Sequence, residues 1–351
     1  MNLHLPGKLN RALTALLCAL LLTGCSRTDS AAQPDLSTTT QTDSSLQIVA
    51  TIFPPYDMAR SISGGRAQVR MLLKPGEETH SYEPTPQDIL AIQHADLFLC
   101  VGGENDVWLD NILKSMGEDA PPVMRLVDLV DLVAEEEKEG MTSRGHHHEE
   151  AHAEHDHEDH GNEEAQEEHD HEAEIDEHVW TSPSNAIAIT EAIAEKMAEL
   201  DPAGAALYRS NAAAYVEEIS ALRADFARLI ENAPRKTLVF GDRFPIRYFV
   251  EEFGLDYYAA FPGCAEDTEP SAATMIYLIE TVKREKIPVV FSIEFSNGAI
   301  ADAIAEASGA GRMTWQTCHN VTRAQFEAGE TYVTLMRSNL DALKAALYGE
   351  E

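Results

Sequence analysis

The feature that most constrains the fold is a stretch of about 28 residues, from Ala205 to Asn232, that keeps apolar residues at helical spacing without any Pro or Gly. At 1.5 Å per residue, a helix of that length is roughly 40 Å long and rigid. Strand-like and helix-like segments alternate on both sides of it, which is typical of parallel sheets. The sequence therefore predicts an α/β fold of two lobes, each with a parallel β-sheet flanked by helices, joined by one long rigid helix.

Apolar runs and turn residues indicate the individual segments. In the first lobe, residues 46–204, we expect strands at Leu46–Phe53, Gln68–Leu73, Asp96–Val101 and Val123–Leu126, and helices at Tyr56–Ser63, Pro86–His94, Val107–Met116 and from Ser182 or Ser184 to Leu200. Pro54 and Pro55 are expected to end the first strand. After the linker helix, residues 205–233, the second lobe covers residues 234–351, with strands at Lys236–Phe240, Leu255–Ala260, Pro288–Ile293 and Arg312–Trp315, and helices at Pro245–Phe253, Ser271–Glu285, Ala299–Ser308 and Thr331–Tyr348. An apolar content of 44% is enough for two ordinary cores.

Residues 135–177 interrupt the first lobe with a loop rich in acids and histidines. Nine of its histidines are interspersed with Asp and Glu: His146, His147, His148, His152, His155, His157, His160, His169 and His171. Imidazoles and carboxylates at such close spacing offer many overlapping ligand sets for Zn²⁺ and similar metals. Because the run has no apolar residues to bury, we interpret it as a surface loop that collects metal weakly.

The charge of the chain is concentrated in the same loop. The formal net charge is −34, and residues 135–177 hold nineteen acids against Lys138 and Arg144, which is half of that total. Neither the loop nor the rest of the chain has the basic patch that a nucleic-acid binder needs, so we expect no nucleic-acid partner.

The N-terminus predicts the compartment. Residues 1–25 contain two basic residues, an apolar run at 12–22 and the ending Leu-Thr-Gly-Cys, which resembles a signal peptide with a bacterial lipobox. Cys25 would then be the lipidated first residue of the mature chain, and the polar residues 26–45 a flexible tether. We expect an extracytoplasmic protein, lipid-anchored to the bacterial cell membrane.

Outside the histidine run, a few side chains are placed as metal ligands would be. His80 lies in a loop after a strand, His178 just before a helix, and His319 after the last predicted strand. Asp242 and Glu294 each follow an apolar strand, and ligands are expected where loops leave the carboxyl ends of strands. His94 ends a predicted helix, so we interpret it as structural.

Several motifs resemble one family. They are G-x-x-x-H-x-Y-E-P-T-P-x-D around His80, D-x-H-V-W-x-S-P around His178, Y-F-x-x-x-F-G-L from Tyr248, and T-Y-x-x-L-M-x-x-N-L-x-x-L near the end. From about Ile48 onward the chain resembles the zinc and manganese solute-binding lipoproteins of bacterial ABC importers, a ZnuA/TroA-like family. The resemblance implies a metal in the cleft between the lobes, delivery to an ABC permease with its ATPase, and ligands at His80 and His178.

The second lobe departs from the family pattern. Where a His or Glu usually precedes the Y-F motif, this chain has Asp242, which we take as the substitute. Where an Asp often follows the last strand, it has Cys318 and His319. We predict a closed shell of His80, His178, Asp242 and His319, with Glu294 and Cys318 as rival ligands. Zn²⁺ is favoured over Mn²⁺, because imidazoles suit zinc and oxygens suit manganese.

Two other classes of function compete with a monomeric importer component. A secreted zinc hydrolase would need a pair such as H-E-x-x-H on a helix, and no such pair lies in a predicted helix. A metal-storing surface lipoprotein or adhesin would use the histidine-rich loop itself as its functional part. Whether one tight site survives deletion of that loop distinguishes this class from an importer component.

Overall fold

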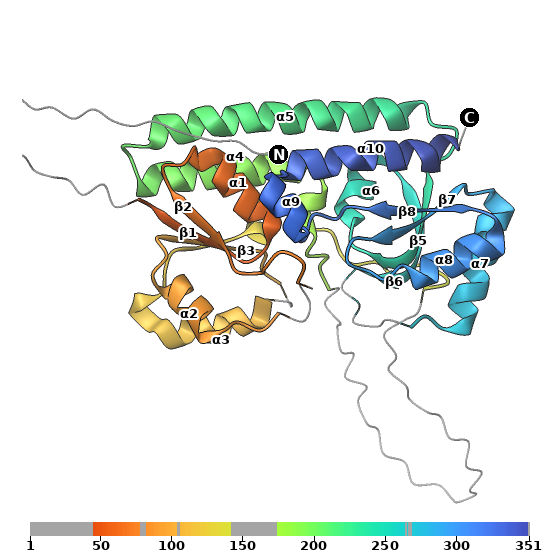
Figure 1. Ribbon diagram of the computed structural model, residues 1–351, viewed down its shortest axis with the longest axis horizontal. Helices are drawn as coiled ribbons and strands as arrows, with labels where there is room; N and C mark the ends of the chain where they lie inside the picture. Colours follow the sequence, from red (N-terminus) through yellow and green to blue (C-terminus); the bar gives the residue numbers. More distant parts are fainter. Residues whose placement is uncertain are drawn as a thin grey trace, which may run out of the picture. The chain divides into compact units, whose positions relative to one another are not determined.

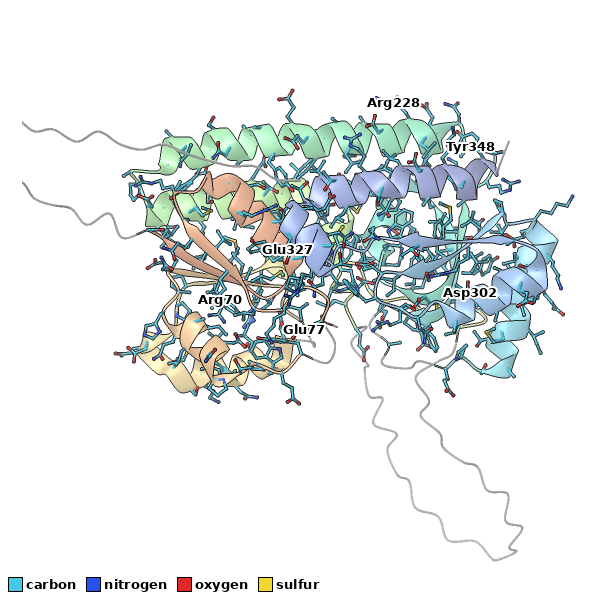
Figure 2. All side chains as sticks on the ribbon, in the orientation of Figure 1. Arg70, Glu77, Arg228, Asp302, Glu327 and Tyr348 are labelled. Carbon is cyan, nitrogen blue, oxygen red and sulfur yellow. The ribbon has the colours of Figure 1, made fainter. Side chains whose placement is uncertain are left out.

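The computed structural model describes residues 45–77, 82–103, 106–141, 174–263, 265 and 269–349. These residues belong to one compact unit that contains two parallel β-sheets (Figure 1). In this described part of the chain, no helix has the length and apolar character needed to cross a membrane. Charged side chains such as Arg228 and Asp302 lie on the outside (Figure 2).

The first sheet has the strand order β2-β1-β3-β4, and all its pairings are parallel. Its strands are β1 (Gln47–Ala50), β2 (Gln68–Met71), β3 (Leu97–Cys100) and β4 (Val123–Arg125). The central β3 reads Leu-Phe-Leu-Cys and is buried at every position, as expected for a strand covered on both faces.

The first sheet is flanked by α1 (Phe53–Ser63) and α4 (Pro183–Leu200), and by α2 (Pro86–Gln93) and α3 (Val107–Met116). Short 3₁₀ turns follow at Gly117–Asp119, Leu126–Leu129 and Val179–Thr181. The prediction for residues 53–55 was wrong: Pro54 and Pro55 lie in the first turn of α1. Proline is tolerated there, because the first amides of a helix have no carbonyl partner within it.

The second sheet repeats this topology in the order β6-β5-β7-β8, again wholly parallel. Its strands are β5 (Thr237–Phe244), β6 (Asp256–Pro262), β7 (Val289–Ile293) and β8 (Gly311–Trp315). Its helices are α6 (Arg247–Phe253), α7 (Ala272–Glu285), α8 (Ala299–Ser308) and α9 (Arg323–Ala328), of which α9 was not predicted. Strand β5 is longer than predicted, with a register irregularity between Phe240 and Arg243, so Asp242 lies within the strand and not after it.

One long helix runs along both lobes on one side (Figure 1). The long α5 (Ala205–Glu231) packs against α1 and α4 of the first lobe and against α10 (Tyr332–Tyr348), which itself covers the second sheet. The apolar face of α5 is buried along its whole length, from Tyr208 to Ile230. These observations confirm the predicted α/β fold of two lobes.

The two lobes share their largest hydrophobic cluster. The largest hydrophobic cluster is continuous from Ile48 in β1, through Phe226 in α5, to Phe240 in β5 and Leu343 in α10. Two smaller clusters lie on the outer faces, under α2 and α3 in the first lobe and under α7 and α8 in the second. A shared core makes independent motion of the two lobes costly, because separation would expose apolar surface.

Candidate metal centre

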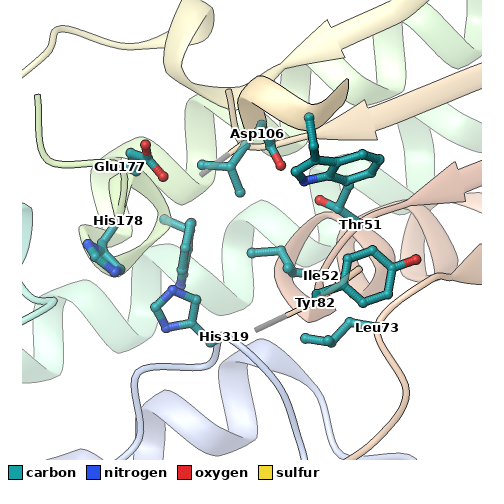
Figure 3. Close-up of a pocket in the computed structure, with 11 residues that line it drawn as sticks. Thr51, Ile52, Leu73, Tyr82, Asp106, Glu177, His178 and His319 are labelled. Carbon is teal, nitrogen blue, oxygen red and sulfur yellow. The ribbon is translucent and has the colours of Figure 1, made fainter. Parts of the chain in front are cut away.

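A pocket lies where the two lobes meet, and both contribute to it (Figure 3). Its described lining residues are Thr51, Ile52, Leu73, Tyr82, Val101, Asp106, Trp108, Glu177, His178, Trp180 and His319. The histidines and Glu177 form one side, and Ile52, Leu73 and Tyr82 form an apolar side. The Thr51 hydroxyl is buried and has no hydrogen-bond partner among the described residues.

His178 is held in one orientation by its own loop. It precedes the 3₁₀ turn at Val179–Thr181 and is 1% exposed. Its Nδ1 lies 3.0 Å from Oδ1 of Asp176, and its backbone N–H donates to the same oxygen at 2.8 Å. A buried carboxylate accepts hydrogen bonds only, so Nδ1 carries the proton and Nε2 carries the lone pair. That is the tautomer in which an imidazole binds metal through Nε2.

His319 is oriented by a chain of two hydrogen bonds. The Thr317 hydroxyl lies 3.1 Å from Nδ1 of His319 and 2.6 Å from Oε1 of Glu294, whose other oxygen accepts the Thr317 backbone N–H at 2.7 Å. The hydroxyl has a single proton, which it donates to the carboxylate, so it accepts the Nδ1 proton of His319. The Nε2 of His319 therefore also carries the lone pair.

The two histidine rings meet in the pocket. Their centroids are 4.7 Å apart with the planes at 87°, and the Trp180 ring packs against both. The Trp180 indole N–H donates to the Thr317 carbonyl at 2.9 Å. Two nitrogen donors from opposite lobes are thus held side by side by buried contacts.

The pocket also contains two acids that the sequence analysis missed. Glu177 is 5% exposed and lies against Gly103, while Asp106 accepts the Gly102 N–H at 2.8 Å. Burial raises the pKa of Asp106, and hydrogen bonds from Gly102 and Val101 oppose the shift. Glu177 stands within the D-x-H motif that marked His178 as a candidate. Asp106 comes after an apolar strand, which is the feature that marked Asp242 and Glu294.

The second-lobe candidates other than His319 are not among the described residues that line the pocket. Asp242 is 7% exposed, and its carboxylate accepts the backbone N–H groups of Arg243 and Ile293. Glu294 is bound to Thr317, and burial of its carboxyl raises its pKa to about 7. The ligand roles of Asp242 and Glu294 stay predictions.

Cys318 points away from the pocket side of its loop. It is a free thiol, fully buried in the main core, at a backbone φ of +65°. A positive φ is rare for a residue other than Gly. At this position the Cys318 side chain faces the core, whereas the next side chain, His319, faces the pocket. Burial raises the pKa of the Cys318 thiol, which disfavours the thiolate that binds metal. The placement favours His319 over Cys318 as a ligand.

His80, Cys25 and the histidines from His146 to His171 lie outside the described residues. Within the described ranges, no group of three or more His, Cys, Asp or Glu side chains could hold a metal ion. The base of the histidine-rich loop is described: Ala134 pairs with Ile175, and Lys138 lies over the Tyr257 ring of the second lobe. The chain leaving that loop leads through Asp176 directly to His178.

Comparison with known proteins decides the family. The family model described as "Zinc-uptake complex component A periplasmic" (ZnuA) matches residues 48–346. The chain belongs to the ZnuA family. This confirms the resemblance drawn from the motifs around His80 and His178.

Relatives of the ZnuA-family chain include two named for zinc. It is 30% identical over 336 residues to the zinc-binding lipoprotein AdcA of Streptococcus pneumoniae strain TIGR4, covering 95% of this chain and 60% of that protein. It is 28% identical over 330 residues to the high-affinity zinc uptake system protein ZnuA of Bacillus subtilis strain 168, covering 94% and 95%. The chain thus spans well under two thirds of the length of AdcA.

Solved structures agree with this family assignment. The Zn(II)-bound ZnuA-like domain of S. pneumoniae AdcA superposes with a TM-score of 0.67 at 26% identity, covering 87% of this chain and 99% of that one. The metal-dependent lipoprotein YcdH of B. subtilis gives the same TM-score at 26% identity, covering 86% and 99%. Both have the fold described above.

Proposed function

We propose that this protein is the extracytoplasmic metal-binding component of an ABC importer, which captures Zn²⁺ between its lobes and delivers it to a membrane permease and its ATPase. The observation that carries the proposal is the contact between His178 and His319, with ring centroids 4.7 Å apart. Each Nδ1 is engaged by an acceptor of its own lobe, so both Nε2 atoms are suited to one metal.

The proposed ligand set is His80, His178 and His319, with Asp242 as the predicted fourth member. Three imidazoles favour Zn²⁺ over Mn²⁺, with Zn–N distances of about 2.0–2.1 Å. A closed shell suits a carrier, because a catalytic zinc keeps one position open for water. We therefore propose delivery of the metal and no catalysis.

The anchor and the loop complete the proposal. Lipidation at Cys25 would hold a monomeric protein at the cell membrane, near its permease. The histidine-rich loop would raise the local metal concentration beside the pocket, because its base ends at Asp176 and His178. Zn²⁺ is the cargo in this scheme, with Mn²⁺ as the alternative.

Zinc titration of the mature protein tests the proposal, with and without residues 145–174. We expect one tight zinc in both forms, and its loss in His178→Ala, His319→Ala and His80→Ala. His94→Ala is the matched control, because His94 is an exposed histidine whose Nδ1 bonds to Leu90. Tight zinc that survives the His178→Ala, His319→Ala double change would refute the pocket assignment. Loss of tight zinc on loop deletion would favour a metal-storing lipoprotein or adhesin.

Asp242 needs a separate comparison. Asp242→Asn keeps an acceptor for one backbone N–H but weakens a carboxylate ligand, whereas Asp242→Ala removes both roles. If Asp242 binds zinc, both variants lose affinity to a similar extent. If only Asp242→Ala is affected, and mainly in thermal stability, the carboxylate is structural and the fourth ligand lies elsewhere.

A further inference from the structure

The residue that orients His178 lies in a short antiparallel stem, formed by residues 133–136 and 174–176. Within this stem Ala134 pairs with Ile175, and the Asp176 backbone N–H donates to the Val133 carbonyl at 3.0 Å. Asp176 is 1% exposed. Because it is buried, its backbone carbonyl needs a hydrogen-bond donor from within the protein.

Tyr248, in the first turn of α6 in the second lobe, supplies that donor. Its side chain is buried, at 3% exposed. The hydroxyl donates to the Asp176 carbonyl at 2.7 Å and accepts the Val133 backbone N–H at 3.2 Å. Since a hydroxyl has one proton, the roles in these two bonds are fixed. One hydroxyl of the second lobe therefore joins the two strands of the stem.

The backbone of the second lobe also packs closely against the same pair of residues. Gly263 directly follows β6. A methyl group at Gly263 would lie 3.1 Å from Oδ2 of Asp176 and 3.4 Å from Cε1 of His178. Asp176 and His178 belong to the first lobe by sequence, but their nearest surroundings include the second lobe.

We propose that Tyr248 is a positioning residue for metal binding, which acts through Asp176 on His178. Both backbone groups of Asp176 are bound, the N–H by Val133 and the carbonyl by Tyr248. This fixes the direction in which the Asp176 carboxylate meets Nδ1 and the backbone N–H of His178. A ligand of the first lobe thus takes its orientation from the second. The inference rests on the proposed function and assigns Tyr248 a part in the affinity of that same site.

Tyr248→Phe tests this role, because it removes the hydroxyl and keeps the ring. We expect zinc affinity to fall about tenfold, as for other groups that orient metal ligands. The visible spectrum of the Co²⁺-loaded protein should also change, because it reports the arrangement of the ligands around the metal.

Tyr257→Phe is the matched control. Tyr257 is a second buried tyrosine of the second lobe, at 2% exposed, and its hydroxyl donates to the Glu136 carboxylate of the stem at 3.2 Å. Its single proton goes to that side chain and not to the backbone of Asp176. We expect Tyr257→Phe to keep the wild-type zinc affinity and Co²⁺ spectrum.

Hydrogen exchange in the zinc-free protein tests the positioning without any metal. The amides of Asp176 and His178 should exchange faster in Tyr248→Phe, because the stem opens more often when the Asp176 carbonyl loses its donor. Both amides should keep their wild-type exchange in Tyr257→Phe. Urea unfolding of the two variants separates this local effect from a loss of global stability, which would speed exchange throughout the protein.

Combination with Asp176→Asn gives the sharpest comparison. If Tyr248 acts through Asp176, Tyr248→Phe weakens the zinc affinity of the Asp176→Asn protein much less than that of the wild type. Equal weakening in both backgrounds, or unchanged exchange of the His178 amide in Tyr248→Phe, would overturn the inference. Absence of tight zinc in the wild type would instead overturn the proposed function, so the two failures are distinguishable.

Discussion

Oδ1 of Asp176 accepts two hydrogen bonds from one residue, the Nδ1–H and the backbone N–H of His178. Both side chains are 1% exposed. The carboxylate therefore determines the tautomer of the imidazole and the direction of its ring at the same time. Carboxylate partners of this kind also raise the basicity of a metal-binding histidine.

Substitution Asp176→Asn tests this pair. Asparagine keeps the size of the side chain and removes the charge, so we expect zinc affinity to fall roughly 10- to 100-fold. Competition with a chromogenic chelator would measure the dissociation constant. Asp201→Asn, which removes a carboxylate in the turn between α4 and α5, serves as the control. Equal affinities in wild type and Asp176→Asn would show that His178 needs no such partner.

The hydrogen bond between the Thr317 hydroxyl and His319 can be tested in the same way as that between Asp176 and His178. Thr317→Val keeps the branched shape and removes the hydroxyl that joins Glu294 to His319. We expect about tenfold weaker zinc binding, because the ring loses its acceptor. Thr317→Ser restores the hydroxyl and should restore affinity. The prediction fails if the Ser and Val variants bind zinc equally well.

Asp57 joins three helices at a buried point. Its carboxylate is 0% exposed and accepts from Arg60 of α1, the Tyr215 hydroxyl of α5 and the Tyr332 N–H of α10. Asp57→Ala leaves three donors without their acceptor, so we expect a loss of about 3–5 kcal/mol in the free energy of unfolding. Tyr215→Phe removes one bond and should cost about 1–2 kcal/mol. Urea unfolding of the zinc-free protein measures both, and similar costs would contradict the predicted ranking.

The ion pair between Asp201 and Arg66 should make the stability of the protein depend on pH. Hydrogen bonds from the Arg66 guanidinium, with a further one from Tyr208, hold the pKa of this carboxyl below its ordinary value of 3.8. A lowered folded-state pKa means that the contribution to stability is present above about pH 4 and is lost as the pH falls further. Because the pair is partly exposed, we expect only about 1 kcal/mol.

Urea unfolding at pH 6 and pH 3 checks this sign. Wild type should be more stable than Asp201→Asn at pH 6, and the difference should shrink at pH 3. A difference that grows as the pH falls would contradict the assignment of the stabilising form to the carboxylate.

The apolar spacing and the capping residues of the sequence predicted most helices and strands correctly. The bounds of α3 and α8 agree with the prediction, and Ser182 and Ser271 cap α4 and α7 as hydroxyl residues at such starts do. The misses have local causes too. Two prolines began a helix where a strand end was expected, and a register irregularity carried β5 past Asp242.

The sequence by itself determined the element types, the family motifs and the candidacy of His178 and His319, because spacing, caps and ligand chemistry are local properties. Only the tertiary structure decided that these two rings touch, that Glu177 and Asp106 share their pocket, and that the Asn320 amide donates to the carbonyls of Lys74 and Glu77. It also decided that the largest hydrophobic cluster has members in both lobes. Such contacts join residues far apart in the sequence, and their geometry depends on how whole helices and sheets pack, which no local spacing encodes.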